Sequence, residues 1–152
     1  MRSSITLQNP VHLEKAIKWL SLASDVNGDG GVLIRYSLVR FRNWHPAGWQ
    51  PSYPEATGYI IPAFLDYSRF VKNGSYKVRA SKMADWLVSI QNPDGSIKGG
   101  NIESKNGSFA FDTGQIIFGQ CALALYISFW VCDGGVFYFC EGIGIKVIWK
   151  RA

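Results

Sequence analysis

The sequence predicts an all-α fold built from repeated helical hairpins, and three observations lead to this prediction. The chain of 152 residues is 47% hydrophobic and 18% charged, a balance that supports one packed domain and excludes intrinsic disorder. Apolar residues recur at helical spacing in several segments. A Trp-Leu pair followed by an Asp-Gly turn occurs twice, beginning at Trp19 and again at Trp86, which is typical of a repeat architecture.

The first helix is predicted over residues 10–24. Asn9 and Pro10 suit the N-cap and the first helical position, and apolar residues follow Leu13 at helical spacing. Asn, Asp and Gly residues in the segment 25–31 favour turns, so they should end this helix. A long loop is predicted from there to about Gln50.

The second helix is predicted to begin at a capping box formed by Ser52 and Glu55. In such a box the serine oxygen accepts a hydrogen bond from an early helical N–H, and the glutamate bonds back to the serine N–H. Pro62 has no N–H to donate, so it should kink the helix or split it near Ile61.

Two further helices are predicted in the second half of the chain. The third covers about residues 75–90 and ends at the Pro-Asp-Gly turn of residues 93–95. Asp112 and Gln115 form a second candidate capping box, in which Asp112 repeats the role of Ser52. A fourth helix should start there and continue through about residue 123.

These elements group into two hairpins, at about residues 10–70 and 75–126, within one domain of residues 1–126. Residues 127–152 contain no third Trp-Leu and Asp-Gly signature and are rich in Cys, Phe and Gly. We expect an irregular hydrophobic tail there, either aberrant or divergent. An incomplete row of hairpins leaves an apolar helix face uncovered, so self-association through that face is also expected.

Charge and targeting signals predict a cytoplasmic protein without a nucleic-acid partner. The net charge is +5, from 16 Lys and Arg against 11 Asp and Glu, and the cations are scattered, which disfavours nucleic-acid binding. The N-terminal segment up to Leu20 carries no readable secretory signal. The apolar run of residues 116–132 is at the lower length limit for a membrane span, but Asp133 and the capping box before it favour a buried helix.

Three stretches of the sequence resemble the α/α-toroid superfamily, which contains terpenoid cyclases and protein prenyltransferases. They are GWQPSYPEATGYIIP at residues 48–62, WLVSIQNPDGS at residues 86–96 and FDTGQ at residues 111–115. The specific similarity, over about residues 10–125, is to bacterial toroid proteins associated with polysaccharide biosynthesis. It implies helical hairpins around a central cavity, and two hairpins imply a partial toroid.

In a toroid, the loops that open the inner helices surround one mouth of the cavity, so the candidate site is placed there. Glu55 and Asp112 are the candidate general acid and base, although helix capping would also explain both carboxylates. Aromatic rings can stack on a sugar while polar atoms bond its hydroxyls. The candidate substrate-binding residues are His45, Trp49, Tyr53, Tyr59 and Gln115.

No metal or cofactor is expected from the sequence. Asp25, Asn27 and Asp29 imitate the start of a calcium loop, but the twelfth position, which needs a glutamate, is Tyr36. The glycines of residues 28–31 lack the Lys and Ser/Thr of a phosphate loop. Residues 1–152 also lack the D-x-D-D motif of squalene-type cyclases and a recognisable zinc-ligand set like that of protein prenyltransferases.

The resemblance and the aromatic, acidic mouth predict a protein that binds or processes a polysaccharide or its precursor. A catalytic version would be a lyase, a hydrolase or an epimerase-like enzyme, and two hairpins alone are expected to be inactive. One alternative is an isoprenoid-binding or cyclase-like protein, whose ligand would include a lipid-linked saccharide. Another is a non-catalytic repeat scaffold for protein interaction.

Overall fold

The computed structural model describes residues 10–40 and 47–131. Their elements, in chain order, are α1 (Pro10–Asp25), β1 (Tyr36–Ser37), β2 (Gly48–Trp49), α2 (Pro54–Val71), α3 (Ser75–Ser89) and α4 (Ala110–Val131). Helices dominate, which agrees with the predicted all-α class, and the antiparallel β1–β2 ribbon is an addition to it. The predicted tail overlaps α4 at residues 127–131, and residues 132–152 lie outside the described part of the chain.

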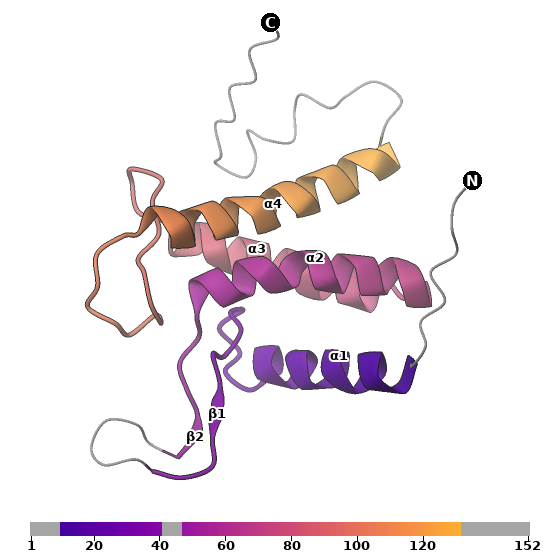
Figure 1. Ribbon diagram of the computed structural model, residues 1–152. Coiled ribbons are helices and arrows are strands. Elements are labelled where there is room, and N and C mark those ends of the chain that lie inside the picture. The colour runs from indigo at the N-terminus through magenta and orange to yellow at the C-terminus, as the bar shows by residue number, and fades with distance from the viewer. Residues whose placement is uncertain (1–9, 41–46, 132–152) are drawn as a thin grey trace, which may run out of the picture.

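The core forms around α2, which packs against both α3 and α4 (Figure 1). Apolar side chains of these three helices, together with residues from α1 and from the turns, are removed from solvent. The largest fully buried side chains of α2 and α3 are Ile61, Phe64, Met83 and Leu87. The predictions for residues 10–24 and 75–90 are confirmed by α1 and α3 to within one residue at each end.

The predicted capping box at Ser52 is wrong. Helix α2 begins at Pro54, its N-cap is Tyr53, and no side chain caps it. Ser52 is fully buried and its backbone pairs with Leu33 in an isolated bridge. Its hydroxyl accepts a hydrogen bond from the Asn27 side chain at 3.3 Å. The serine therefore connects two loops instead of capping the helix.

Pro62 does not split α2, which runs without interruption from Pro54 to Val71. The carbonyl that loses its helical partner to Pro62 is that of Gly58, four residues earlier. This carbonyl faces Gly119 of α4, and a Cβ atom at Gly119 would collide with it. A Cβ atom at Gly58 would in turn lie 2.9 Å from the Gln115 carbonyl oxygen. The two helices thus make backbone contact at a pair of glycines beside the proline.

The second predicted capping box is also wrong, because α4 begins at Ala110, two residues before Asp112. The Asp112 side chain is only 8% exposed, and its Oδ2 accepts a hydrogen bond from the Gly100 N–H at 3.2 Å. The carboxylate therefore holds the preceding loop and is not the N-cap of the helix. The interaction between a carboxylate and the helix dipole remains, since Asp112 lies in the first turn.

The same hydrogen bonds recur in the two halves of the chain. After α1, the Val32 N–H donates to Thr57 Oγ1 at 2.9 Å; after α3, the Ile97 N–H donates to Thr113 Oγ1 at 3.2 Å. Each of these turns also contains an aspartate whose Oδ1 accepts the N–H two residues ahead, at 2.8 Å for Asp29 and 3.0 Å for Asp94. The turn after α1 and the turn after α3 are thus each fastened to the following helix in the same way.

One isolated bridge occurs in each half of the chain, and the two bridges show which residues of the halves correspond. Leu33 pairs with Ser52, and Lys98 pairs with Ser108. Ser52 before α2 therefore corresponds to Ser108 before α4, and not to Asp112 as the capping boxes suggested. In this register Thr57 corresponds to Thr113, and Gly58 corresponds to Gly114.

Candidate functional site

Four of the predicted site residues come together where α2 and α4 begin. Tyr53 precedes α2, Glu55 is in its first turn, and Tyr59 lies about one turn further along. Asp112 is in the first turn of α4. The glycine contact between the helices holds these two starts at the same end of the molecule (Figure 1).

The electrostatics of the tyrosines show that the four side chains share one environment. Burial raises the pKa of Tyr53 most, followed by the negative charges of Asp112 and Glu55. The pKa of Tyr59 is also raised, by burial first, then by the charge of Glu55 and hydrogen bonding to it, and then by the charge of Asp112. Both carboxylates therefore act on both phenols, which a purely local arrangement on one helix would not produce.

The two carboxylates differ in what they can do. Asp112 is buried and fixed by the loop at residues 99–100, where a Cβ atom on Gly99 would lie 2.9 Å from its Oδ2. Glu55 is half-buried, and the ring of Tyr59 beside it is 45% exposed. A ligand would therefore reach Glu55 and Tyr59 first, while Asp112 adds negative charge from the buried side.

The remaining predicted residues are placed differently. Trp49 packs against Trp19 with the ring planes tilted by 36° and the centroids 5.0 Å apart, and it meets Tyr36 edge-on at 5.2 Å, so its contacts join the ribbon to α1. Gln115 is half-buried, and its backbone is part of the contact with Gly58. His45 lies outside the described residues, between residue 40 and residue 47.

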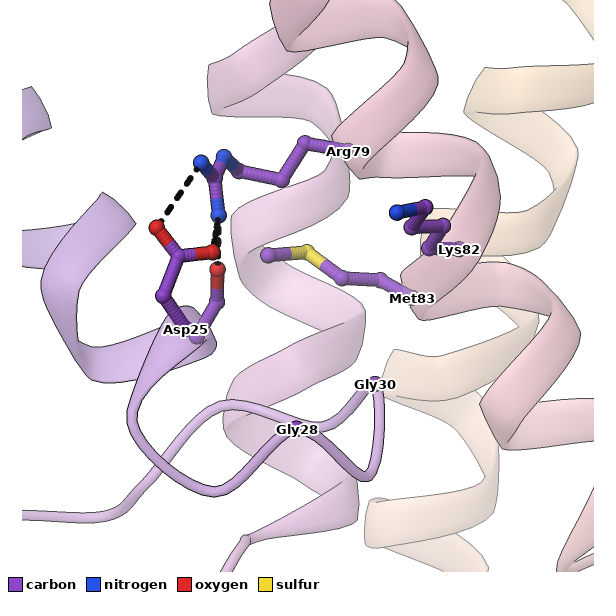
Figure 2. A pocket seen from close by; sticks show the side chains of 7 residues that line it. Asp25, Gly28, Gly30, Arg79, Lys82 and Met83 are labelled. Atoms are coloured by element: carbon purple, nitrogen blue, oxygen red, sulfur yellow. Dashed lines mark hydrogen bonds and ion pairs between the residues drawn. The ribbon is translucent and has the colours of Figure 1, made fainter.

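A cavity of about 130 Å³ lies at the turn after α1, against α3, and its lining contains none of the predicted site residues (Figure 2). Arg79 closes one side of it, since its Nη2 bonds Asp25 Oδ2 at 3.0 Å and its Nη1 bonds Ser24 Oγ at 2.5 Å. These bonds fasten the end of α1 to α3. The Asp25 carboxylate, which would be the first ligand of the calcium-like loop, is therefore engaged by Arg79.

One buried polar group, Gln120 of α4, was not predicted from the sequence. The residue is 1% exposed, and its Nε2 has no hydrogen-bond partner in the part of the chain that is described. An unpartnered buried amide costs about 1 to 3 kcal/mol. Only its helical spacing could be read from the sequence, because burial on this side of α4 depends on how the helices pack.

Neither a metal site nor a known relative adds to this picture. Across residues 10–40 and 47–131, no group of three or more His, Cys, Asp or Glu side chains is arranged to hold a metal ion. None of the helices in these ranges combines the length and the apolar run needed to cross a membrane. Comparison with protein-family models, with curated proteins and with solved structures finds no match.

The shared environment of the tyrosines can be tested by titration. We expect Glu55→Gln to lower the pKa of both Tyr53 and Tyr59, because it removes a neighbouring negative charge that opposes phenolate formation. Residue-resolved NMR titration of the tyrosine Cζ signals measures this directly. Both phenols should still titrate above the ordinary value of about 10, since burial is the larger cause.

The matched control for this titration is Asp66→Asn, which removes one exposed negative charge from the same helix. It should leave both tyrosines unchanged, and an equal effect of the two variants would show that Glu55 has no specific contact. Because a raised tyrosine pKa in the folded state adds stability below about pH 10, that contribution is lost as the pH rises through the folded-state pKa. The direction expected at high pH is therefore a fall in the free energy of unfolding.

Proposed function

We propose that the two hairpins are part of an α/α toroid and that the shared start of α2 and α4 binds a polysaccharide or its precursor. The proposal is supported by the recurring bonds of the two halves, Val32 to Thr57 and Ile97 to Thr113, which make each hairpin a copy of one unit. The site is supported by the contact of α2 and α4 at Gly58 and Gln115, which brings the first turns of the two helices together. The raised pKa values of Tyr53 and Tyr59, to which Glu55 and Asp112 both contribute, agree with this placement.

The chemistry of this cluster suits a saccharide. A partly exposed tyrosine ring offers an apolar face for a sugar ring, and its hydroxyl hydrogen-bonds sugar hydroxyls. Carboxylates accept hydrogen bonds from hydroxyl groups and, in an enzyme, transfer protons to and from reacting oxygens. In a catalytic version Glu55 is the residue that meets the substrate, and Asp112 is the second member of the acid and base pair.

The charge of the cluster sets the class of saccharide. Among the described residues, no arginine or lysine contributes to the pKa shifts of the two tyrosines, so the two carboxylates are expected to repel a uronic acid. Neutral sugars avoid this repulsion, and amino sugars gain attraction from it. The proposed ligands are therefore neutral or amino-sugar oligosaccharides.

Binding of defined oligosaccharides tests this proposal. We expect oligomers of glucosamine or N-acetylglucosamine to bind, as measured by calorimetry, and oligomers of galacturonic acid not to bind. Glu55→Gln should weaken binding about tenfold or more, since hydrogen bonds to charged groups contribute about 1.5 to 3 kcal/mol. Tyr59→Ala should also weaken it, because it removes both the ring that contacts the sugar and a neutral hydrogen bond worth about 0.5 to 1.5 kcal/mol. Asp66→Asn on the same helix should bind like the wild type.

The result that would overturn the proposal is equally specific. If Glu55→Gln and Tyr59→Ala bind each oligosaccharide as tightly as Asp66→Asn does, the cluster is not the binding site. A preference for the galacturonic acid oligomer would contradict the charge argument.

A further inference from the structure

The register of the repeat identifies an empty counterpart of the contact between α2 and α4. Gly58 of α2 receives the backbone of α4, with the Gln115 carbonyl oxygen and Ile116 Cα each 2.9 Å from the position of a Cβ atom. Its counterpart in α4 is Gly114, because Ser52 corresponds to Ser108. A Cβ atom at Gly114 would have nothing within 4 Å. The surface of α4 at Gly114 could therefore accept a helix as the surface of α2 at Gly58 does, and no described residue covers it.

The face of α4 around Gly114 is apolar and exposed. Phe111, Phe118 and Leu125 follow one another at a spacing of about two helical turns, so they lie in one row along the helix. All three are exposed, Phe118 by 58%. Large apolar side chains in a continuous exposed row are typical of an interaction surface.

The complementary face is on α2 of the same chain. In the contact between the two helices, α4 contributes Gly119, which covers the Gly58 carbonyl, and Tyr126, whose ring lies 4.3 Å from the Arg69 guanidinium carbon. In the register of the repeat, Ala63 and Phe70 are the corresponding positions in α2. Both are exposed, Phe70 by 57%.

We propose that a second copy of this chain docks head to tail, with the Ala63 and Phe70 face of its α2 against the Gly114, Phe118 and Leu125 face of α4. The interface then follows the register of the contact between α2 and α4 inside one chain, with the two helices further apart where Ala63 replaces Gly119. In this register the Phe70 ring meets Leu125, where the internal contact has Tyr126 and Arg69. The two faces differ from each other, so the association is heterologous and each copy keeps one face free for the next.

The copied contact is looser than the internal one at its centre. In the proposed contact, Phe118 of α4 stands where the internal contact has Pro62 of α2, and Ala63 of the docking α2 stands where the internal contact has Gly119 of α4. The carbonyl of Gly114 is therefore not released by a proline, and the approaching helix carries a Cβ atom. The association is consequently weaker than the internal packing and depends on protein concentration.

Sedimentation velocity of the full chain over a wide range of concentration is the experiment. We expect the wild type to form species that grow with concentration. Phe118→Glu disables the α4 face and Ala63→Glu disables the α2 face, so each variant alone should be monomeric. An equimolar mixture of the two should form a 1:1 dimer and nothing larger, because one intact pair of faces remains.

Several results would overturn the proposal. A wild type that is monomeric at every concentration would do so, and so would a mixture of the two variants that stays monomeric. Association of Ala63→Glu alone would show that α4 pairs with α4 and that the contact is not head to tail. Leu38→Glu, at an exposed apolar residue beside β1, is the matched control and should associate like the wild type.

Circular dichroism melting of both variants separates lost association from lost folding, since both substituted side chains are exposed in the single chain. The test is also independent of the proposed saccharide site. It changes neither Glu55 nor Tyr59, so oligosaccharide binding and association can fail separately.

Discussion

Replacing Gly119 with alanine is expected to lower the free energy of unfolding by about 1 to 3 kcal/mol, the usual cost of forcing an extra carbon into a packed contact. The added Cβ atom meets the Gly58 carbonyl oxygen and its Cα, which are backbone atoms and cannot rotate away. The helices must therefore separate, and the side chains buried between them lose contact. Chemical denaturation followed by circular dichroism measures the change.

Gly114→Ala is the matched control, since Gly114 is an interior glycine of the same helix with open space around it. Alanine is favoured over glycine in a helix by about 1 kcal/mol, so this variant should be slightly more stable than the wild type. Both variants should be compared at a concentration where the chain is monomeric. Equal stability of the two would contradict the close approach of α2 and α4 at Gly119.

The second large effect is expected at Trp86. Its side chain is 8% exposed and covers the turn after α1, where a Cβ atom on Gly31 would lie 2.6 Å from the ring. Trp86→Ala removes this ring and leaves a cavity between α3 and the turn. The expected loss is about 3 to 5 kcal/mol of unfolding free energy, which thermal or chemical denaturation will report.

Trp19→Ala is the matched control for Trp86→Ala, because Trp19 is the tryptophan of the other Trp-Leu pair. Its side chain is 52% exposed and contacts Trp49. Loss of this aromatic pair should cost about 1 kcal/mol. If Trp19→Ala were as destabilising as Trp86→Ala, the turn would not be the feature that Trp86 stabilises.

The sequence was most informative where local signals agreed with one another. Proline at the first position, apolar spacing and a glycine-rich stop predicted α1 to within one residue. The starts of α2 and α4 were placed wrongly because Ser52 and Asp112 have the right chemistry for a cap but use it on Asn27 and Gly100. A tertiary partner outcompeted the local one, and no pattern in a single sequence reveals that competition.

The part of the candidate site that depends on local sequence was predictable. Tyr53, Glu55 and Tyr59 are near one another along a single helix, so their proximity follows from the sequence. Their proximity to Asp112 was expected only from the resemblance to toroid proteins, and in the structure it depends on the contact of α2 and α4 at glycines, which no local pattern predicts. Trp49 was assigned to the substrate-binding set from its residue type and its place in the loop before the second predicted helix, and its observed contacts are with Trp19 and Tyr36.

The two isolated bridges have a consequence for how the hairpins can diverge. Leu33 and Ser52 enclose residues 34–51, whereas Lys98 and Ser108 enclose the shorter segment 99–107, although the helices behind the two bridges are fastened alike. Each bridge thus fixes the two ends of its loop, although both loops still contact the helices: Trp49 meets Trp19 of α1, and the Gly100 N–H donates to Asp112 of α4. Because the bridged residues hold the loop ends in both halves, the segment between them can differ in length while the turns and helices keep the same bonds.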